Sequence, residues 1–146
     1  MITTQSFKKI KPLIFLTILS PSLFWSYQFI NGSLGVNPIE KFMDNMGEMA
    51  LRLIVLTLFI SSLSEFKKFR FLIDVRRMIG LFAFFYVSCH FLTYIALDHF
   101  FDMNFIIKDI IKRPFITFGF TGFILLLPLV FTSTNSMLKK LTFKLV

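Results

Sequence analysis

MIGLFAFFYVSCHFLTYIAL, residues 78–97, is the stretch that decides the fold of this chain. It contains no Asp, Glu, Lys or Arg. About 20 apolar residues in a helix are enough to cross the hydrocarbon core of a bilayer. The stretch therefore predicts a transmembrane helix.

Three further stretches of the chain are long and apolar enough for the same interpretation. They cover residues 12–30, 46–63 and 114–133. Together with 78–97 they predict an all-α integral membrane bundle of four transmembrane helices. Little sequence remains outside these spans, so we expect residues 1–146 to form a single domain.

The composition supports a membrane location. Hydrophobic residues make up 55% of the 146 residues, 22 of them are phenylalanine, and only 16% are charged. Ordinary globular domains have about 25% charged residues. A short chain cannot hide so many apolar side chains from water. The numbers exclude disorder and a multi-domain enzyme, and a single cysteine, Cys89, excludes an internal disulfide.

The net charge of +8 reflects how basic residues are distributed between the spans. Nucleic-acid binding would need a basic face on a soluble fold. Here most basic residues fall in alternate segments: Lys8, Lys9, Lys11, Lys67, Lys68, Arg70, Arg76, Arg77, Lys139, Lys140 and Lys144. The other gaps hold Lys41, Lys108, Lys112 and Arg113. Because basic loops stay in the cytoplasm, we expect both termini to be cytoplasmic.

The two remaining gaps differ in character. Asn31-Gly32 and Asn37-Pro38 are typical of turns in the first gap. In the gap before residue 114, apolar residues recur at helical spacing: Met103, Ile106, Ile107, Ile110 and Ile111. Charged residues occupy the other faces: Asp102, Lys108, Asp109 and Lys112. The pattern predicts a short interfacial helix between the third and fourth spans.

Three ionisable residues lie within the spans, where such groups are costly and often functional. They are Glu48, Arg52 and His90. Glu48 and Arg52 are four residues apart, hence on one helical face, and can pair with each other. A ligand-facing role for them is the alternative.

His90 and Arg52 are expected at a similar depth. His90 lies seven residues before Leu97, or roughly 10 Å from the outer end of its span. Arg52 lies six residues after Met46, or roughly 9 Å. An imidazole can bind haem iron axially, and a guanidinium can meet a haem propionate. The alternative for His90 is a hydrogen bond that joins two helices. We expect His99 to be an exposed interfacial histidine.

Other functional classes lack the necessary residues. The chain contains no glycine-rich phosphate loop, no Cys-x-x-Cys and no HExxH. It has no serine, histidine and acid predicted at one depth. A transporter would need more polar residues along a path than these spans contain.

Four runs together resemble the MsrQ (YedZ) family of haem-binding membrane subunits. They are RRMIGLFAFFYVSCHFLTYIALD (76–98), KRPFITFGFTGFILLLPLVFTST (112–134), GEMALRLIVLTL (47–58) and FINGSLGVNPIEKF (29–42). The similarity covers nearly the whole chain. The resemblance implies a ferric-reductase-like transmembrane domain in a bacterial inner membrane.

The resemblance also implies a function. Such subunits bind haem b and take electrons from the quinone pool or a flavin, for which FMN is a candidate cofactor. They pass the electrons to a periplasmic molybdopterin enzyme that reduces methionine sulfoxide. His90 matches the family's axial haem ligand. Arg52 matches a position that is often basic there, and its propionate role is our inference.

The chain departs from the family pattern at its C-terminal end. The family continues with a W-x-x-LH stretch and further helices that carry the remaining histidines. This chain stops at Val146, after Lys139-Lys140-Leu141. We therefore expect a C-terminally truncated form of the subunit. The alternative is a cofactor-free four-helix membrane scaffold or an inactive remnant of the subunit.

Overall fold

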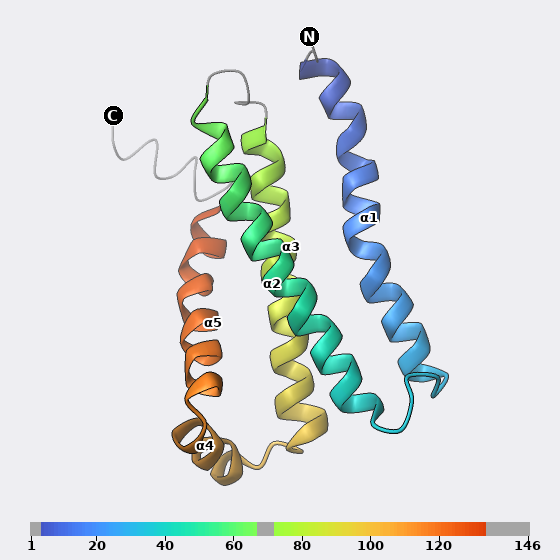
Figure 1. Cartoon of the computed structure of the whole chain (residues 1–146), viewed down its shortest axis with the longest axis vertical. Helices are drawn as coiled ribbons and strands as arrows, with labels where there is room; N and C mark the ends of the chain where they lie inside the picture. Colours follow the sequence, from blue (N-terminus) through green and yellow to red (C-terminus); the bar gives the residue numbers. More distant parts are fainter. Residues whose placement is uncertain (1–3, 67–71, 134–146) are drawn as a thin grey trace. The chain divides into compact units, whose positions relative to one another are not determined.

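The computed structural model describes residues 4–66 and 72–133, and regular structure in that part is entirely helical. Its elements are α1 (Thr4–Ile30), α2 (Pro38–Ser64), α3 (Ile73–Thr93), the π-helical turn η2 (Tyr94–Asp98), α4 (Met103–Lys112) and α5 (Pro114–Ser133) (Figure 1). Four segments are long and apolar enough to cross a membrane: Ile10–Ile30, Pro38–Ser64, Val75–Asp98 and Pro114–Thr132. The predicted all-α fold with four transmembrane helices is confirmed for the described residues.

The chain divides into two compact units, Met1–Asp98 and His99–Val146. Several basic residues used to predict the orientation lie outside the described part: Lys67, Lys68, Arg70, Lys139, Lys140 and Lys144. The cytoplasmic location of both termini and the single domain therefore stay predictions.

Two helices begin earlier than their apolar stretches. α2 starts at Pro38 and not near Met46, and α3 starts at Ile73 and not near Met78. Proline suits the first turn of a helix, since its missing N–H would have no partner there. Asn37-Pro38 is therefore a helix start, whereas the predicted turn at Asn31-Gly32 is confirmed, with Gly32 at a φ of +66°. Hydropathy locates the membrane-spanning part of a helix and not its polar first turns.

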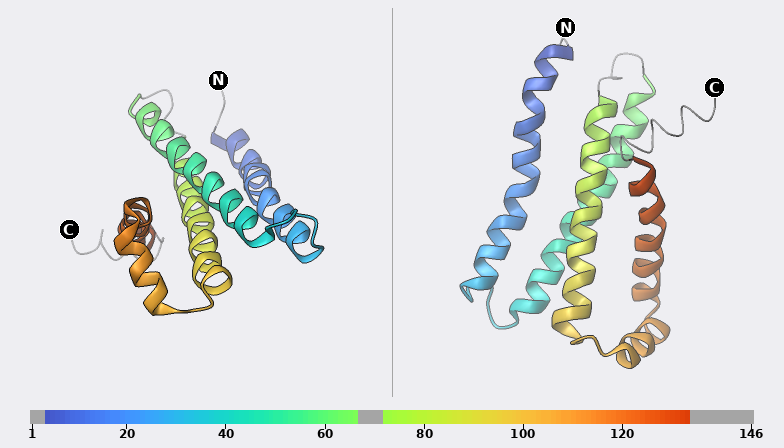
Figure 2. Two further views of the ribbon diagram at one scale, coloured as in Figure 1. Left: turned by 60° about the horizontal axis from the view of Figure 1, so that its bottom comes forward. Right: turned by 180° about the vertical axis from the view of Figure 1, so that it is seen from behind.

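The core of the first unit lies mainly between α2 and α3, which run side by side (Figures 1 and 2). α2 contributes Met46, Ala50, Leu53 and Ile60, and α3 contributes Val75, Ile79, Phe82, Ala83 and Tyr86. These positions recur at three- and four-residue spacing, so each helix presents one face to the other. Small residues such as Ala50 and Ala83 allow the close approach on which packing in a membrane depends.

A hydroxyl group joins α3 to α1. The Tyr86 side chain is fully buried, and its hydroxyl donates to the Ile18 carbonyl at 2.6 Å. The Ser22 N–H donates in turn to the Tyr86 oxygen at 3.2 Å. Ile18 and Ser22 are the carbonyl and amide that a regular helix pairs directly. The tyrosine hydroxyl therefore takes a place in the hydrogen-bond ladder of α1, beside Pro21.

The second unit contains α4 and α5. The Asp102 carboxylate caps α4 by accepting from the N–H groups of Asn104 and Phe105 at 3.1 and 3.3 Å. After Arg113, Pro114 starts α5. A helix at Met103–Lys112 agrees with the predicted short helix between two spans. Its place at the membrane surface stays a prediction.

Candidate functional site

His90 lies near the C-terminal end of α3 and turns its ring toward α2. Nδ1 is 2.8 Å from the carbonyl oxygen of Met43, and the ring is half-buried. A carbonyl can only accept a hydrogen bond, so Nδ1 carries the hydrogen. In the neutral imidazole the lone pair then belongs to Nε2.

Gly47 lies directly against the His90 ring. A Cβ added at this glycine would stand 2.8 Å from Nδ1 and 3.0 Å from Cε1 of His90. Met43 and Gly47 are four residues apart, so both belong to one face of α2. The face supplies a carbonyl for the ring nitrogen and a gap in which the ring fits.

The Nε2 atom of His90 is available to a ligand. No bond to it is found among the described residues, and no buried side-chain nitrogen or oxygen there lacks a partner. The atom therefore keeps accessible surface. A histidine with one nitrogen held by a carbonyl and the other open has the arrangement typical of a metal ligand.

The donor set around His90 indicates what kind of metal group fits. The described residues contain no group of three or more His, Cys, Asp or Glu side chains that could hold an ion. A bare metal ion would therefore have fewer than three such ligands in that part of the chain. A haem brings four nitrogens of its own and needs the protein only at the axial positions. The residues present therefore fit a haem, which His90 would hold through Nε2.

Arg52 and Glu48 pair with each other on a different side of α2. Both side chains are largely exposed, at 67% and 63%. The predicted pair is confirmed. Arg52 lies five residues beyond Gly47, hence about 140° around the helix and about 7.5 Å along it. His90 is level with Gly47, so the structure does not bring Arg52 to it.

The expectation that His99 is exposed is wrong. Its side chain is 10% exposed, and Nε2 is 3.3 Å from Oδ2 of Asp109. Arg113 meets the other oxygen of the same carboxylate, with Nε at 3.4 Å. A tight turn, with Phe100 and Phe101 at φ of 46° and 62°, follows His99 before α4 begins. A buried carboxylate needs such partners, so the cluster stabilises the second unit.

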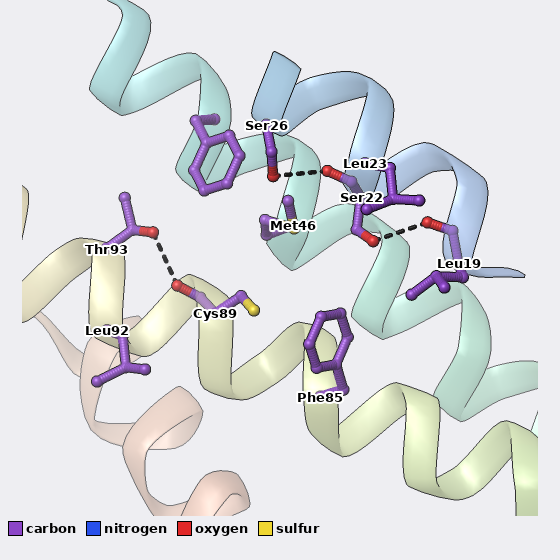
Figure 3. Close-up of a pocket in the computed structure, with 10 residues that line it drawn as sticks. Leu19, Ser22, Leu23, Ser26, Met46, Phe85, Cys89, Leu92 and Thr93 are labelled. Atoms are coloured by element: carbon purple, nitrogen blue, oxygen red, sulfur yellow. Dashed lines mark hydrogen bonds between the residues drawn. The ribbon is translucent and has the colours of Figure 1, made fainter. Parts of the chain in front are cut away.

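A pocket of about 310 Å³ lies between α1, α2 and α3 (Figure 3). Its lining residues are Leu19, Ser22, Leu23, Ser26, Phe42, Met46, Phe85, Cys89, Leu92 and Thr93. The three hydroxyl groups in this wall all donate to carbonyls of their own helices, at 2.7 to 2.8 Å. The three hydroxyl hydrogens are therefore already used within their own helices, and the pocket does not include His90.

Sequence reasoning found His90 but missed its two neighbours on α2. Met43 acts through its main chain, which leaves no trace in residue type. Because the predicted span began at Met46, Met43 and Gly47 were not recognised as one face of a helix. The π-helical turn η2, one turn beyond His90, was also missed. Such turns are frequent near functional sites.

Comparison with known proteins places the chain in a transmembrane family. Residues 46–145 match the family described as ferric reductase like transmembrane component. The haem-binding subunit MsrQ of the protein-methionine-sulfoxide reductase of Herminiimonas arsenicoxydans is 46% identical over 132 residues. That alignment covers 90% of this chain and 61% of the relative. The MsrQ protein of Caulobacter vibrioides is 46% identical over 84% of this chain and 59% of its own length.

A third relative shows that the segment also occurs in a longer protein. Magnetosome protein MamZ of Magnetospirillum gryphiswaldense is 41% identical over 90% of this chain but only 21% of its own length. The chain spans about 60% of the length of the MsrQ relatives. No solved structure matches it.

Proposed function

Since this chain belongs to the ferric reductase like transmembrane family, we propose that it is a membrane electron-transfer subunit that holds haem b through His90. Its relatives named MsrQ are described as haem-binding subunits of a protein-methionine-sulfoxide reductase. The observation that carries the proposal is the state of the His90 ring. Nδ1 is held by the Met43 carbonyl, and Nε2 has no bond among the residues that the structure describes.

Each residue of the site has a distinct task. A bound haem supplies one-electron transfer. Nε2 of His90 would bind the haem iron, and the Met43 carbonyl fixes the tautomer and the direction of the ring. A ligand nitrogen whose partner nitrogen donates to a carbonyl is a stronger base, which favours the oxidised metal. The apolar helices around His90 keep water away and so influence the reduction potential.

The proposed electron path leads to a soluble enzyme. We propose that electrons come from the quinone pool or a flavin such as FMN, in the bacterial inner membrane. The proposed acceptor is a periplasmic molybdopterin catalytic subunit that reduces methionine sulfoxide. The resemblance of residues 76–98 and 112–134 to the MsrQ family supports this path, and the names of the relatives support a methionine-sulfoxide reductase as the acceptor.

A visible spectrum tests the function. The chain is purified in detergent, haem is added, and reduced-minus-oxidised spectra are recorded. We expect a b-type absorption band that reaches full height at one haem per chain. The variant His99→Gln is the matched control, because it alters the other histidine of the chain and should keep the band. A wild-type chain without a band would support the cofactor-free scaffold.

The propionate role of Arg52 stays a proposal with its own test, because Arg52 lies on a different side of α2 from the His90 ring. The Arg52 side chain is 67% exposed, so Arg52→Gln should leave the core between α2 and α3 intact. We expect this variant to bind haem several-fold more weakly, because a propionate loses its cation. Glu48→Gln also breaks the pair of Arg52 with Glu48 but keeps the cation, and its haem affinity should stay at the wild-type value. Equal haem affinities of the two variants would show that Arg52 does not bind a propionate.

A further inference from the structure

We propose that Gly47 is a positioning residue for His90, an inference that rests on the proposed haem site. Its role is to let the imidazole lie against α2, where the Met43 carbonyl can hold Nδ1. The glycine does not itself touch the haem. It controls which way Nε2 points and which nitrogen carries the hydrogen.

The distances leave no room for a larger residue. Real Cβ atoms essentially never approach another heavy atom within 3.0 Å, and a Cβ at Gly47 would stand 2.8 Å from Nδ1. The ring atom in contact is the one that is bonded to the Met43 carbonyl at 2.8 Å. A new methyl group would therefore press on the ring atom that this hydrogen bond holds, so the ring or α2 must shift.

Loss of the hydrogen bond would change the ligand in two ways. The Nδ1 hydrogen would no longer have a fixed acceptor, so either nitrogen could carry it. The open nitrogen would also become a weaker base, which makes it a weaker ligand of an oxidised metal. Both changes reach the haem through His90 alone.

The α2–α3 interface offers a matched control. Gly80 of α3 is also helical, but a Cβ there would meet Thr57 Cγ2 at 3.8 Å, which is ordinary contact. Exchange of glycine for alanine inside a helix favours the helix by about 0.5–1 kcal/mol at either position. The difference between Gly47→Ala and Gly80→Ala therefore isolates the contact with His90.

The first experiment compares these two variants with the wild type in detergent. We expect Gly47→Ala to bind haem about 10- to 100-fold more weakly, as is typical when the group that orients a metal-binding histidine is lost. Its midpoint potential should be more positive and its absorption band shifted. Gly80→Ala should match the wild type in all three measurements.

A second experiment does not depend on haem. Thermal unfolding of the haem-free chain is followed for Gly47→Ala, His90→Ala and the double variant. If the methyl group acts on the His90 ring, Gly47→Ala should lower the melting temperature, and the loss should vanish in the His90→Ala background. Additive effects would show that Gly47 does not act through His90 and would overturn the inference.

The two experiments separate this inference from the proposed function. If the wild type binds haem and Gly47→Ala behaves like Gly80→Ala, only the role of Gly47 is overturned. If the wild type binds no haem, the haem proposal fails and Gly47 positions no ligand. Tight haem binding by the wild type, weak binding by Gly47→Ala and non-additive unfolding together support the inference.

Discussion

His90→Ala should abolish haem binding by this chain, with an affinity loss of more than about 100-fold. Loss of a group that only orients a ligand costs about 10- to 100-fold, so loss of the ligand itself must cost more. Nε2 of His90 has no bond among the described residues, whereas the other histidine, His99, pairs with Asp109 in the second unit. The measurement is the height of the reduced b-type band after haem addition.

Rescue by a free ligand distinguishes ligation from folding. His90→Gly leaves a gap between α2 and α3 that is bounded by Gly47 and the Met43 carbonyl. Imidazole added to this variant should enter the gap and restore the band, since the same carbonyl can hold its N–H group. A band that persists unchanged in His90→Ala would show that the haem is held elsewhere.

The apolar spans could be predicted because hydrocarbon imposes a length and a composition on any helix that crosses it. The start of α2 could not, because Pro38 and the polar residues after it suit a turn and a first helical turn equally well. Prediction was weakest for contacts made by the main chain. Neither the Met43 carbonyl at His90 nor the Ile18 carbonyl at Tyr86 depends on residue type.

The candidate site, like the fold, could be predicted from the sequence only in part. His90 could be found because an ionisable group is rare within an apolar span. Gly47 could not, since glycine is common in membrane helices and its function here is visible only as a distance to one ring. His99 was misjudged because its partner Asp109 lies ten residues away, on a helix whose orientation the sequence pattern does not determine.

Tyr86→Phe should lower the free energy of unfolding of the first unit by about 1–3 kcal/mol. The hydroxyl joins the Ile18 carbonyl to the Ser22 N–H, and no water is at hand in the hydrocarbon core to replace it. Phenylalanine keeps the ring and its packing, so the loss of stability measures the contribution of the hydroxyl group. Tyr86→Ala also removes the ring from a fully buried position and should cost about 3–5 kcal/mol.

Unfolding of the chain by SDS in mixed micelles, followed by circular dichroism, measures these losses. Tyr27→Phe is the matched control, because Tyr27 is on α1 and 67% exposed, and its hydroxyl loss should change nothing. In Tyr86→Phe we also expect faster hydrogen exchange at the Ser22 amide, since its acceptor is gone. α1 already lacks one N–H at Pro21, so a second missing bond in the same turn leaves it weakest where it meets α3. A variant as stable as Tyr27→Phe, with unchanged exchange at Ser22, would mean that Ile18 and Ser22 pair directly once the hydroxyl is removed.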